Sequence, residues 1–136
     1  MTSRSNSDRV ELGLADTSLF VALEHGRPLA GSPPDQLAVS TITVGELRFG
    51  VLAAADGTTR ARRLATLSRV ERLEPLPIDD TVAQAWAALR LALREAGKRM
   101  RVNDSWIAAT AIAHEIPVVT QDGDYEDVPG VAVIRL

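Results

Sequence analysis

The sequence predicts an α/β fold in which helices cover a mostly parallel central sheet. Short apolar runs of strand length alternate along the chain with longer segments whose apolar residues recur at helical spacing. Such alternation is typical of βαβ units, in which a crossover helix packs on a face of the sheet. The length of 136 residues and the hydrophobic share of 46% fit one globular domain with its own core. We expect a single domain over residues 10–136, preceded by a flexible polar tail over residues 1–9.

Composition excludes several classes of protein. No apolar run approaches the ~18 residues of a membrane-spanning helix, and the N-terminus lacks the apolar core of a signal peptide. The absence of cysteine excludes disulfides, thiolate catalysis and zinc sites built on sulfur. The net charge of −3 argues against broad, nonspecific nucleic-acid binding. We therefore expect a cytoplasmic protein without a membrane partner.

The first half of the chain is predicted to alternate strands and helices. Asp16, Thr17 and Ser18 offer N-cap chemistry directly after the first apolar run. Glycine and proline then mark a loop around residues 26–34. The expected elements are a strand over 10–15, a helix over 19–24, a strand over 37–41, a helix that opens at Thr43 and ends before Asp56, and a helix over 58–68.

The second half continues the alternation. Pro75 and Pro77 make residues 73–78 either a short edge strand or an extended connector. Trp86 and Trp106 fall at helical spacing and are expected in the core. The remaining elements are a long helix capped by Asp79 or Asp80 and stopped at Gly97, a helix over 104–114, and strands over 117–120 and 131–134.

Four acids are expected to meet at one rim of the sheet. The helix over 104–114 is apolar or small from Trp106 onward, yet it carries Asp104, a charge that is costly to bury without a partner. Asp16 and Asp122 directly follow strands, and Glu46 lies in the first turn of the helix after the second strand. Ligand sites of parallel sheets lie beyond the carboxyl ends of the strands.

Each acid taken alone has a structural alternative. Asp16 fits a helix cap, Glu46 fits a capping box with Thr43, Asp104 fits a first-turn acid favoured by the helix dipole, and Asp122 fits a turn. Independent caps have no reason to converge, however, and converging carboxylates repel one another. Bound divalent cations remove this repulsion. Ligands that are all oxygen favour Mg²⁺ or Mn²⁺ over zinc.

The same residues resemble the four acidic motifs of PIN-domain ribonucleases. The motifs are Asp16-Thr-Ser, Val-Gly-Glu46-Leu, Asn103-Asp104 followed by Ile-Ala-Ala-Thr-Ala, and Thr120-Gln-Asp122. Residues 13–135 follow the pattern in order and size, and they look most like the VapC-type toxins of type II toxin–antitoxin pairs. The resemblance implies a metal-dependent endoribonuclease, whose products would carry 5′-phosphate and 3′-hydroxyl ends.

Eight side chains are candidates for the site. We hypothesise that one or two Mg²⁺ or Mn²⁺ ions are held by the catalytic carboxylates Asp16, Glu46, Asp104 and Asp122. Asp124 is an additional acid that would assist a second metal, directly or through water. Ser18, Asn103 and Thr120 are small polar neighbours that would support the ligands, with capping and turn bonds as their alternative.

The resemblance also implies partners. Toxins of this type cleave structured RNA, often transfer or ribosomal RNA, and so stop translation; they are usually dimers that a cognate antitoxin keeps inactive. An antitoxin arginine among the acids would compete with metal. From the residues alone, the basic set before the helix over 104–114 is either an RNA contact or a solvated helix face. This set is Arg94, Lys98, Arg99 and Arg101.

Rival functions remain at this stage. A receiver domain needs a lysine near its last strands, whereas the only lysine here, Lys98, precedes the helix over 104–114. A haloacid-dehalogenase-type phosphatase needs an Asp-x-Asp motif, which Asp16-Thr-Ser does not supply. A PIN-like module that binds RNA or protein without cutting, and a PIN nuclease directed at DNA, are the alternatives that keep the same fold.

Overall fold

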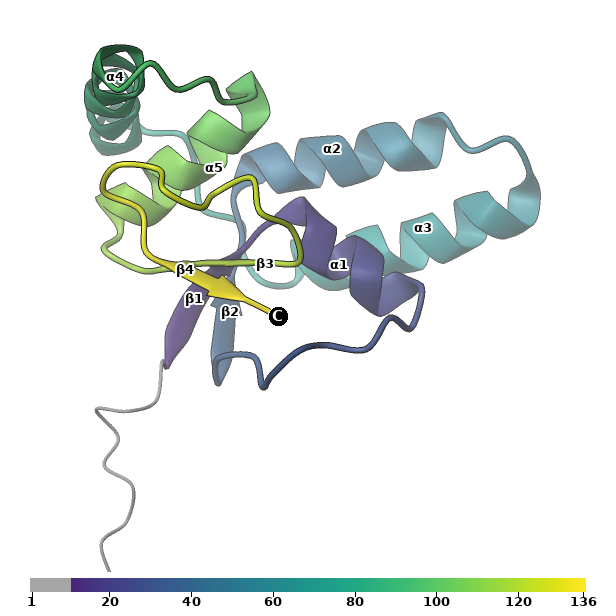
Figure 1. The fold of residues 1–136 in the computed structure, drawn as a ribbon. Helices are drawn as coiled ribbons and strands as arrows, with labels where there is room; N and C mark the ends of the chain where they lie inside the picture. Colours follow the sequence, from purple (N-terminus) through teal and green to yellow (C-terminus); the bar gives the residue numbers. More distant parts are fainter. Residues whose placement is uncertain (1–10) are drawn as a thin grey trace, which may run out of the picture.

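A computed structural model describes residues 11–136. The predicted tail over residues 1–9, and the predicted start of the domain at residue 10, lie outside the described residues. Figure 1 shows one small sheet between two groups of helices. The elements in order are β1 (Leu12–Ala15), α1 (Thr17–Glu24), β2 (Gln36–Ala38), α2 (Thr41–Leu52), α3 (Gly57–Glu71), α4 (Asp80–Glu95), α5 (Val102–Ala113), β3 (Val118–Thr120) and β4 (Val133–Arg135).

The sheet has the strand order β2-β1-β3-β4, and every pairing in it is parallel. The predicted α/β class with a mostly parallel sheet is therefore confirmed. From β1 the chain moves to β2 on one side, and β3 lies on the other side of β1. The carboxyl ends of β1 and β3 thus form the topological switch point, where open α/β sheets bind their ligands.

Two hydrophobic clusters fill the space between the sheet and its helices. Leu14 of β1 and Val118 of β3 belong to the cluster completed by α4 and α5. Their neighbours Ala15 and Val119 belong to the cluster completed by α1, α2 and α3. Because successive residues of a strand point to opposite faces, both faces of this sheet are covered. Two-faced burial explains why the strands are apolar runs without polar alternation.

Helix ends depart from the sequence prediction at one place that matters for the site. α2 begins at Thr41, because Ser40 is its N-cap and accepts a hydrogen bond from the Ile42 backbone N–H (3.0 Å). Thr43 is therefore inside the helix, and the Thr43–Glu46 capping box is not formed. Glu46 lies one turn further along α2 than expected, and its carboxylate is left for other partners.

The other elements follow the prediction closely. Asp16, Asp56 and Asp79 cap α1, α3 and α4 through side-chain oxygens. Gly97 ends the α4 region with a φ of 65°, a conformation that favours glycine. The segment over 73–78 is a connector with one isolated bridge, between Ser40 and Leu76. Between residues 11 and 136, no helix has the length and apolarity that a membrane crossing requires.

The two tryptophans contradict the expectation that they lie in the core. Trp86 of α4 and Trp106 of α5 are only half-buried, and their rings stack on each other. The interior contacts of these helices are made instead by smaller residues such as Leu89 and Ile107. The indole pair lies at the outer edge of the α4–α5 contact.

Candidate active site

Asp16 is held at the switch point by three hydrogen bonds. It caps α1 by accepting the Leu19 backbone N–H at 3.3 Å, and the Ser18 hydroxyl donates to the same Oδ1 at 2.7 Å. Its Oδ2 accepts the Thr120 hydroxyl at 3.0 Å. The side chain is 4% exposed. The predicted cap and the predicted position on the rim are therefore properties of the same carboxylate.

Thr120, the last residue of β3, joins Asp16 to Asp122. Its Oγ1 lies 3.0 Å from Asp16 Oδ2 and 3.3 Å from Asp122 Oδ1, so one hydroxyl proton serves two carboxylates. Ser18 Oγ lies 3.1 Å from Thr120 Oγ1 and accepts the Gln121 backbone N–H at 3.0 Å. These bonds tie the end of β1 to the end of β3, as the parallel sheet predicts.

Glu46 reaches the same region from α2. Thr17 donates its hydroxyl to Glu46 Oε1 at 2.6 Å, and Asn103 donates its side-chain amide to Oε2 at 3.5 Å. Thr17 opens α1 and Asn103 lies in the first turn of α5, so Glu46 is fixed between two helix starts. Sequence reasoning proposed Asn103 as a supporting residue but missed Thr17, which it counted only as cap chemistry.

Asp104 in the first turn of α5 has a buried partner that the sequence did not reveal. The Tyr125 hydroxyl donates to Asp104 Oδ1 at 3.3 Å. Tyr125 lies after the last site acids, in the loop between β3 and β4, and its side chain is fully buried. A single tyrosine in a loop rich in acids gives no sequence signal of this kind, because the contact joins residues 21 positions apart.

Burial and mutual repulsion raise the pKa of two of these acids. Burial is the main cause that raises the pKa of Asp16 to about 6, and Asp122 adds to it, while the hydrogen bonds from Ser18 and Thr120 oppose it. Burial also raises the pKa of Asp104 to about 6, with further repulsion from Asp124 and Glu46. The carboxylates are thus close enough to destabilise each other's charge.

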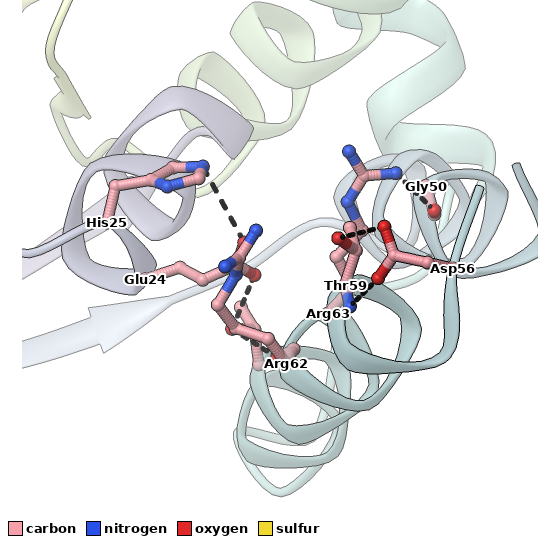
Figure 2. Close-up of polar contacts among 8 residues, drawn as sticks. Glu24, His25, Gly50, Asp56, Thr59, Arg62 and Arg63 are labelled. Atoms are coloured by element: carbon pink, nitrogen blue, oxygen red, sulfur yellow. Dashed lines mark hydrogen bonds and ion pairs between the residues drawn. The ribbon is translucent and has the colours of Figure 1, made fainter. Parts of the chain in front are cut away.

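Among residues 11–136, no Lys, Arg or His forms an ion pair with these acids. The ion pairs of the described chain lie elsewhere, for example between α1 and α3 at Glu24 (Figure 2). Asp124 is exposed, and its backbone N–H donates to Asp122 Oδ1 at 3.2 Å. The rim is therefore acidic and lacks an internal counterion in the described part of the chain.

Comparisons with known proteins agree with this architecture. Residues 14–131 match the family model for the PIN domain. Ribonuclease VapC5 of Mycobacterium tuberculosis is 49% identical over 125 residues, which cover 91% of this chain and 93% of the relative. Ribonuclease VapC4 of the same organism is 48% identical, covering 93% and 98%. The chain belongs to the PIN-domain family and, within it, to the VapC ribonucleases.

Solved structures of this family share the fold. A crystal structure of VapBC-5, a member of the VapBC family of toxin–antitoxin systems from M. tuberculosis, superposes with a TM-score of 0.84 at 45% identity. The match covers 93% of this chain and 99% of that one. The crystal structure of FitAcB from Neisseria gonorrhoeae gives a TM-score of 0.71 at 29% identity, covering 90% and 96%. The single PIN-like unit that the sequence predicted is thus the fold of a VapC chain.

The donor chemistry of this PIN domain fits a hard divalent cation, as is typical of the family. All candidate ligands are carboxylate oxygens, and their unbalanced charge is what a cation would neutralise. Within residues 11–136, no three His, Asp or Glu side chains form a ready-made cage around one ion. Mg²⁺ is commonly held by one or two carboxylates together with waters and substrate phosphates. The open acidic rim suits that mode of binding.

Proposed function

We propose that this VapC chain is a metal-dependent endoribonuclease toxin that cuts a structured RNA, transfer or ribosomal RNA, in the cytoplasm and thereby stops translation. The observation that carries the proposal is the pair formed by the buried Asp16 and the half-buried Asp104, two carboxyls whose charge has no counterion within residues 11–136. Acidic side chains with shifted pKa values that lie at one rim of a sheet are typical of a catalytic site. The family supplies the reaction class, hydrolysis of RNA.

In the proposed site, the rim acids hold the metal ions. Mg²⁺ or Mn²⁺, as one or two ions, would supply a lower pKa for the attacking water and neutralise charge on the phosphate. The ions would be held by Asp16, Glu46, Asp104 and Asp122, with Asp124 assisting.

Neutral donors orient these acids without removing their charge. Ser18 and Thr120 fix the rotamer of Asp16, and Thr17 and Asn103 fix that of Glu46. Tyr125 holds Asp104. Partners of this kind keep a ligand in position and leave its negative charge available to a cation.

We further propose a cognate antitoxin and a homodimer. The relatives of known structure include a VapBC toxin–antitoxin system and FitAcB. Arginine pairs bidentately with carboxylates, and an antitoxin arginine would find the rim acids without a basic partner from residues 11–136. Such an arginine would compete directly with the metal and so keep the toxin inactive.

The test uses the purified toxin after removal of any antitoxin. Total cellular RNA and short DNA are incubated with it in Mg²⁺, in Mn²⁺ and in chelator, and the ends of any products are mapped. Discrete RNA cuts that require metal and leave 5′-phosphates are expected. Cutting of DNA in place of RNA would favour a DNA-directed nuclease, and a folded protein that binds RNA without cutting it under either metal would favour a non-catalytic module.

A further inference from the structure

A second surface of the molecule has the opposite charge from the rim. A groove of about 870 Å³ runs along the outer side of the C-terminal half of α4 and the loop that follows it. Its lining includes four cationic side chains and no acidic one, in a chain whose net charge is −3. The four cations are Arg90, Arg94, Lys98 and Arg99.

These cations keep their charge without an acidic partner in the part of the chain that the structure describes. Within the described chain, none of the four forms an ion pair with an acid. This differs from the arginines of α2 and α3, where Arg48 pairs with Glu71 and Arg62 pairs with Glu24. Free arginines gathered in one groove attract an anion, because each guanidinium offers several donors at fixed angles.

An aromatic platform lies in the same groove. The Trp86 ring stacks on Trp106 with centroids 4.4 Å apart and an interplanar angle of 5°. Trp86 Nε1 donates to Ser105 Oγ at 3.0 Å, which fixes the ring against α5. The Arg90 guanidinium carbon lies over the Trp86 ring, 5.7 Å from its centroid. Fixed aromatic and guanidinium planes beside free cations are the features that bind single-stranded nucleic acid.

One end of the groove is joined to the loop that carries two of the rim acids. Lys98 Nζ donates to the Glu126 backbone oxygen at 2.9 Å, so the end of the groove is bonded to the loop that carries Asp122 and Asp124. Arg99 lies five residues before Asp104 along the chain. In Figure 1 the connection from α4 leads directly to the start of α5, where Asp104 lies. A strand held in the groove would therefore lie beside this loop.

We propose that the groove lined by Trp86, Arg90, Arg94, Lys98 and Arg99 binds a single-stranded segment of the RNA substrate beside the cut site. The cations contact its phosphates, and the Trp86–Arg90 pair stacks with a base. The inference rests on the proposed ribonuclease function and adds to it where the uncut flank of the substrate lies. Stacking and phosphate contacts are tolerant of sequence, so this groove supplies affinity and register, and other contacts select the target.

The experiment compares two pairs of arginines that carry the same charge. Arg94→Gln with Arg99→Gln removes two exposed cations from the groove, and Arg69→Gln with Arg72→Gln removes two exposed cations from α3 and its C-cap. Binding of a short fluorescent single-stranded RNA is measured by anisotropy over a range of salt, in chelator so that no cutting occurs. The two tryptophans of the chain provide a second readout, because both belong to the stacked pair at the groove.

The groove variant is expected to weaken RNA binding about tenfold and to reduce the salt slope by about 1.4, the value for two phosphate contacts of a single strand. RNA should quench the tryptophan fluorescence of the wild type and of the α3 variant, and the two proteins should show the same affinity for RNA. Equal losses of RNA affinity in both variants would overturn the proposal, since nonspecific electrostatic attraction to any arginine pair would then explain binding. A groove variant with unchanged RNA binding but altered self-association or antitoxin binding would also overturn it and assign the groove to a protein.

Failure of the groove and failure of the ribonuclease function can be told apart. Binding in chelator does not depend on cutting, so a wild type that binds RNA through the groove but never cuts contradicts only the proposed activity. If the wild type cuts RNA and the groove variant binds and cuts RNA as well as the α3 variant does, only the proposal that the groove binds RNA is contradicted.

Discussion

Two buried carboxylates at opposite ends of α1 differ in their partners: one has a basic side chain beside it, and the other has only neutral hydrogen-bond donors. The side chain of Glu24 at the end of α1 is 7% exposed, and its Oε2 lies 3.4 Å from Arg62 Nε and 3.7 Å from His25 Nε2. Its Oε1 accepts the Thr66 hydroxyl at 2.8 Å. Figure 2 shows the arginine and the histidine directed at this carboxylate from α3 and from the end of α1. Asp16 at the start of the same helix is equally buried but has only neutral hydrogen-bond donors.

The difference separates charges that serve the fold from charges that serve the site. A buried carboxylate with a guanidinium beside it is balanced within the chain. Asp16 and Asp104 have raised pKa values because burial and neighbouring acids oppose their charge. The chain has fourteen arginines, so the acidic rim does not result from a shortage of bases. A cation from outside the chain would complete it.

The largest expected effect comes from Asp104→Asn. Removing one of the proposed metal ligands should lower RNA cleavage by on the order of a thousandfold, comparable to the loss of a group that stabilises charge in the transition state. The amide still accepts a hydrogen bond from Tyr125, so the circular dichroism spectrum should not change. The measurement is single-turnover cleavage at saturating Mg²⁺.

Glu24→Gln is the matched control for that variant. It neutralises a carboxylate whose side chain is 7% exposed and whose charge is balanced by Arg62. Cleavage should remain at the wild-type rate. Wild-type cleavage by the Asp104 variant, or equal losses in both variants, would show that the rim acids have no special role.

The second effect is on the stability of the metal-free protein. Asp16 has a folded pKa of about 6 against 3.8 for a solvent-exposed aspartate, so the folded chain binds this proton more tightly than the unfolded chain. The contribution of Asp16 to the free energy of unfolding should therefore fall by about 3 kcal/mol as pH rises from about 4 to about 6, and stay low above that. Asp16→Asn, which does not titrate, should be more stable than the wild type near pH 8 in chelator.

Urea unfolding of both proteins across this pH range, with and without Mg²⁺, is the measurement. The difference between wild type and Asp16→Asn isolates this carboxyl from Asp104, which titrates in both. Mg²⁺ should restore the free energy of unfolding of the wild type at high pH, because a ligand that binds only the folded state stabilises it. The free energy of unfolding of Asp16→Asn should remain nearly unchanged. Parallel stability curves for the two proteins would contradict an unbalanced charge at Asp16.

The rim was predictable from sequence because it depends on backbone topology. Asp16 and Asp122 follow parallel strands, and Asp104 opens a helix, so their convergence follows from the order of the elements. Glu46 was expected at the rim, but its capping-box alternative was wrong, since Ser40, three residues before Thr43, is the N-cap of α2. Side-chain capping competes between neighbouring Ser and Thr residues, and spacing alone does not decide which one begins the helix.

The partners of the acids were less predictable. Thr17 and Tyr125 act across tertiary contacts, and neither stands at a spacing that distinguishes it from an ordinary cap or core residue. The stacked tryptophans were missed for the opposite reason. Trp86 and Trp106 have the helical spacing of core residues, yet large rings are often only partly buried, and these two meet at the edge of the α4–α5 contact.

A smaller effect is expected from Tyr125→Phe. The ring stays buried, but Asp104 loses the hydroxyl that fixes its Oδ1. Loss of a residue that orients a metal ligand commonly costs about tenfold in metal affinity or activity. Cleavage should therefore need more Mg²⁺ for half-maximal rate, with thermal stability close to wild type. A lower melting temperature with an unchanged Mg²⁺ requirement would assign Tyr125 to the core alone.

The smallest effect is expected from Arg62→Gln, which removes the counterion on the balanced side of the comparison. Arg62 is 46% exposed, so water and salt already weaken its attraction for Glu24. The variant should lose about 0.5–1 kcal/mol of unfolding free energy, less at high salt, because Glu24 keeps Thr66 and His25 as partners. RNA cleavage should not change. If Arg62→Gln lowered cleavage as Asp104→Asn does, the α1–α3 contact and the acidic rim would be one functional unit, and the contrast between them would be wrong.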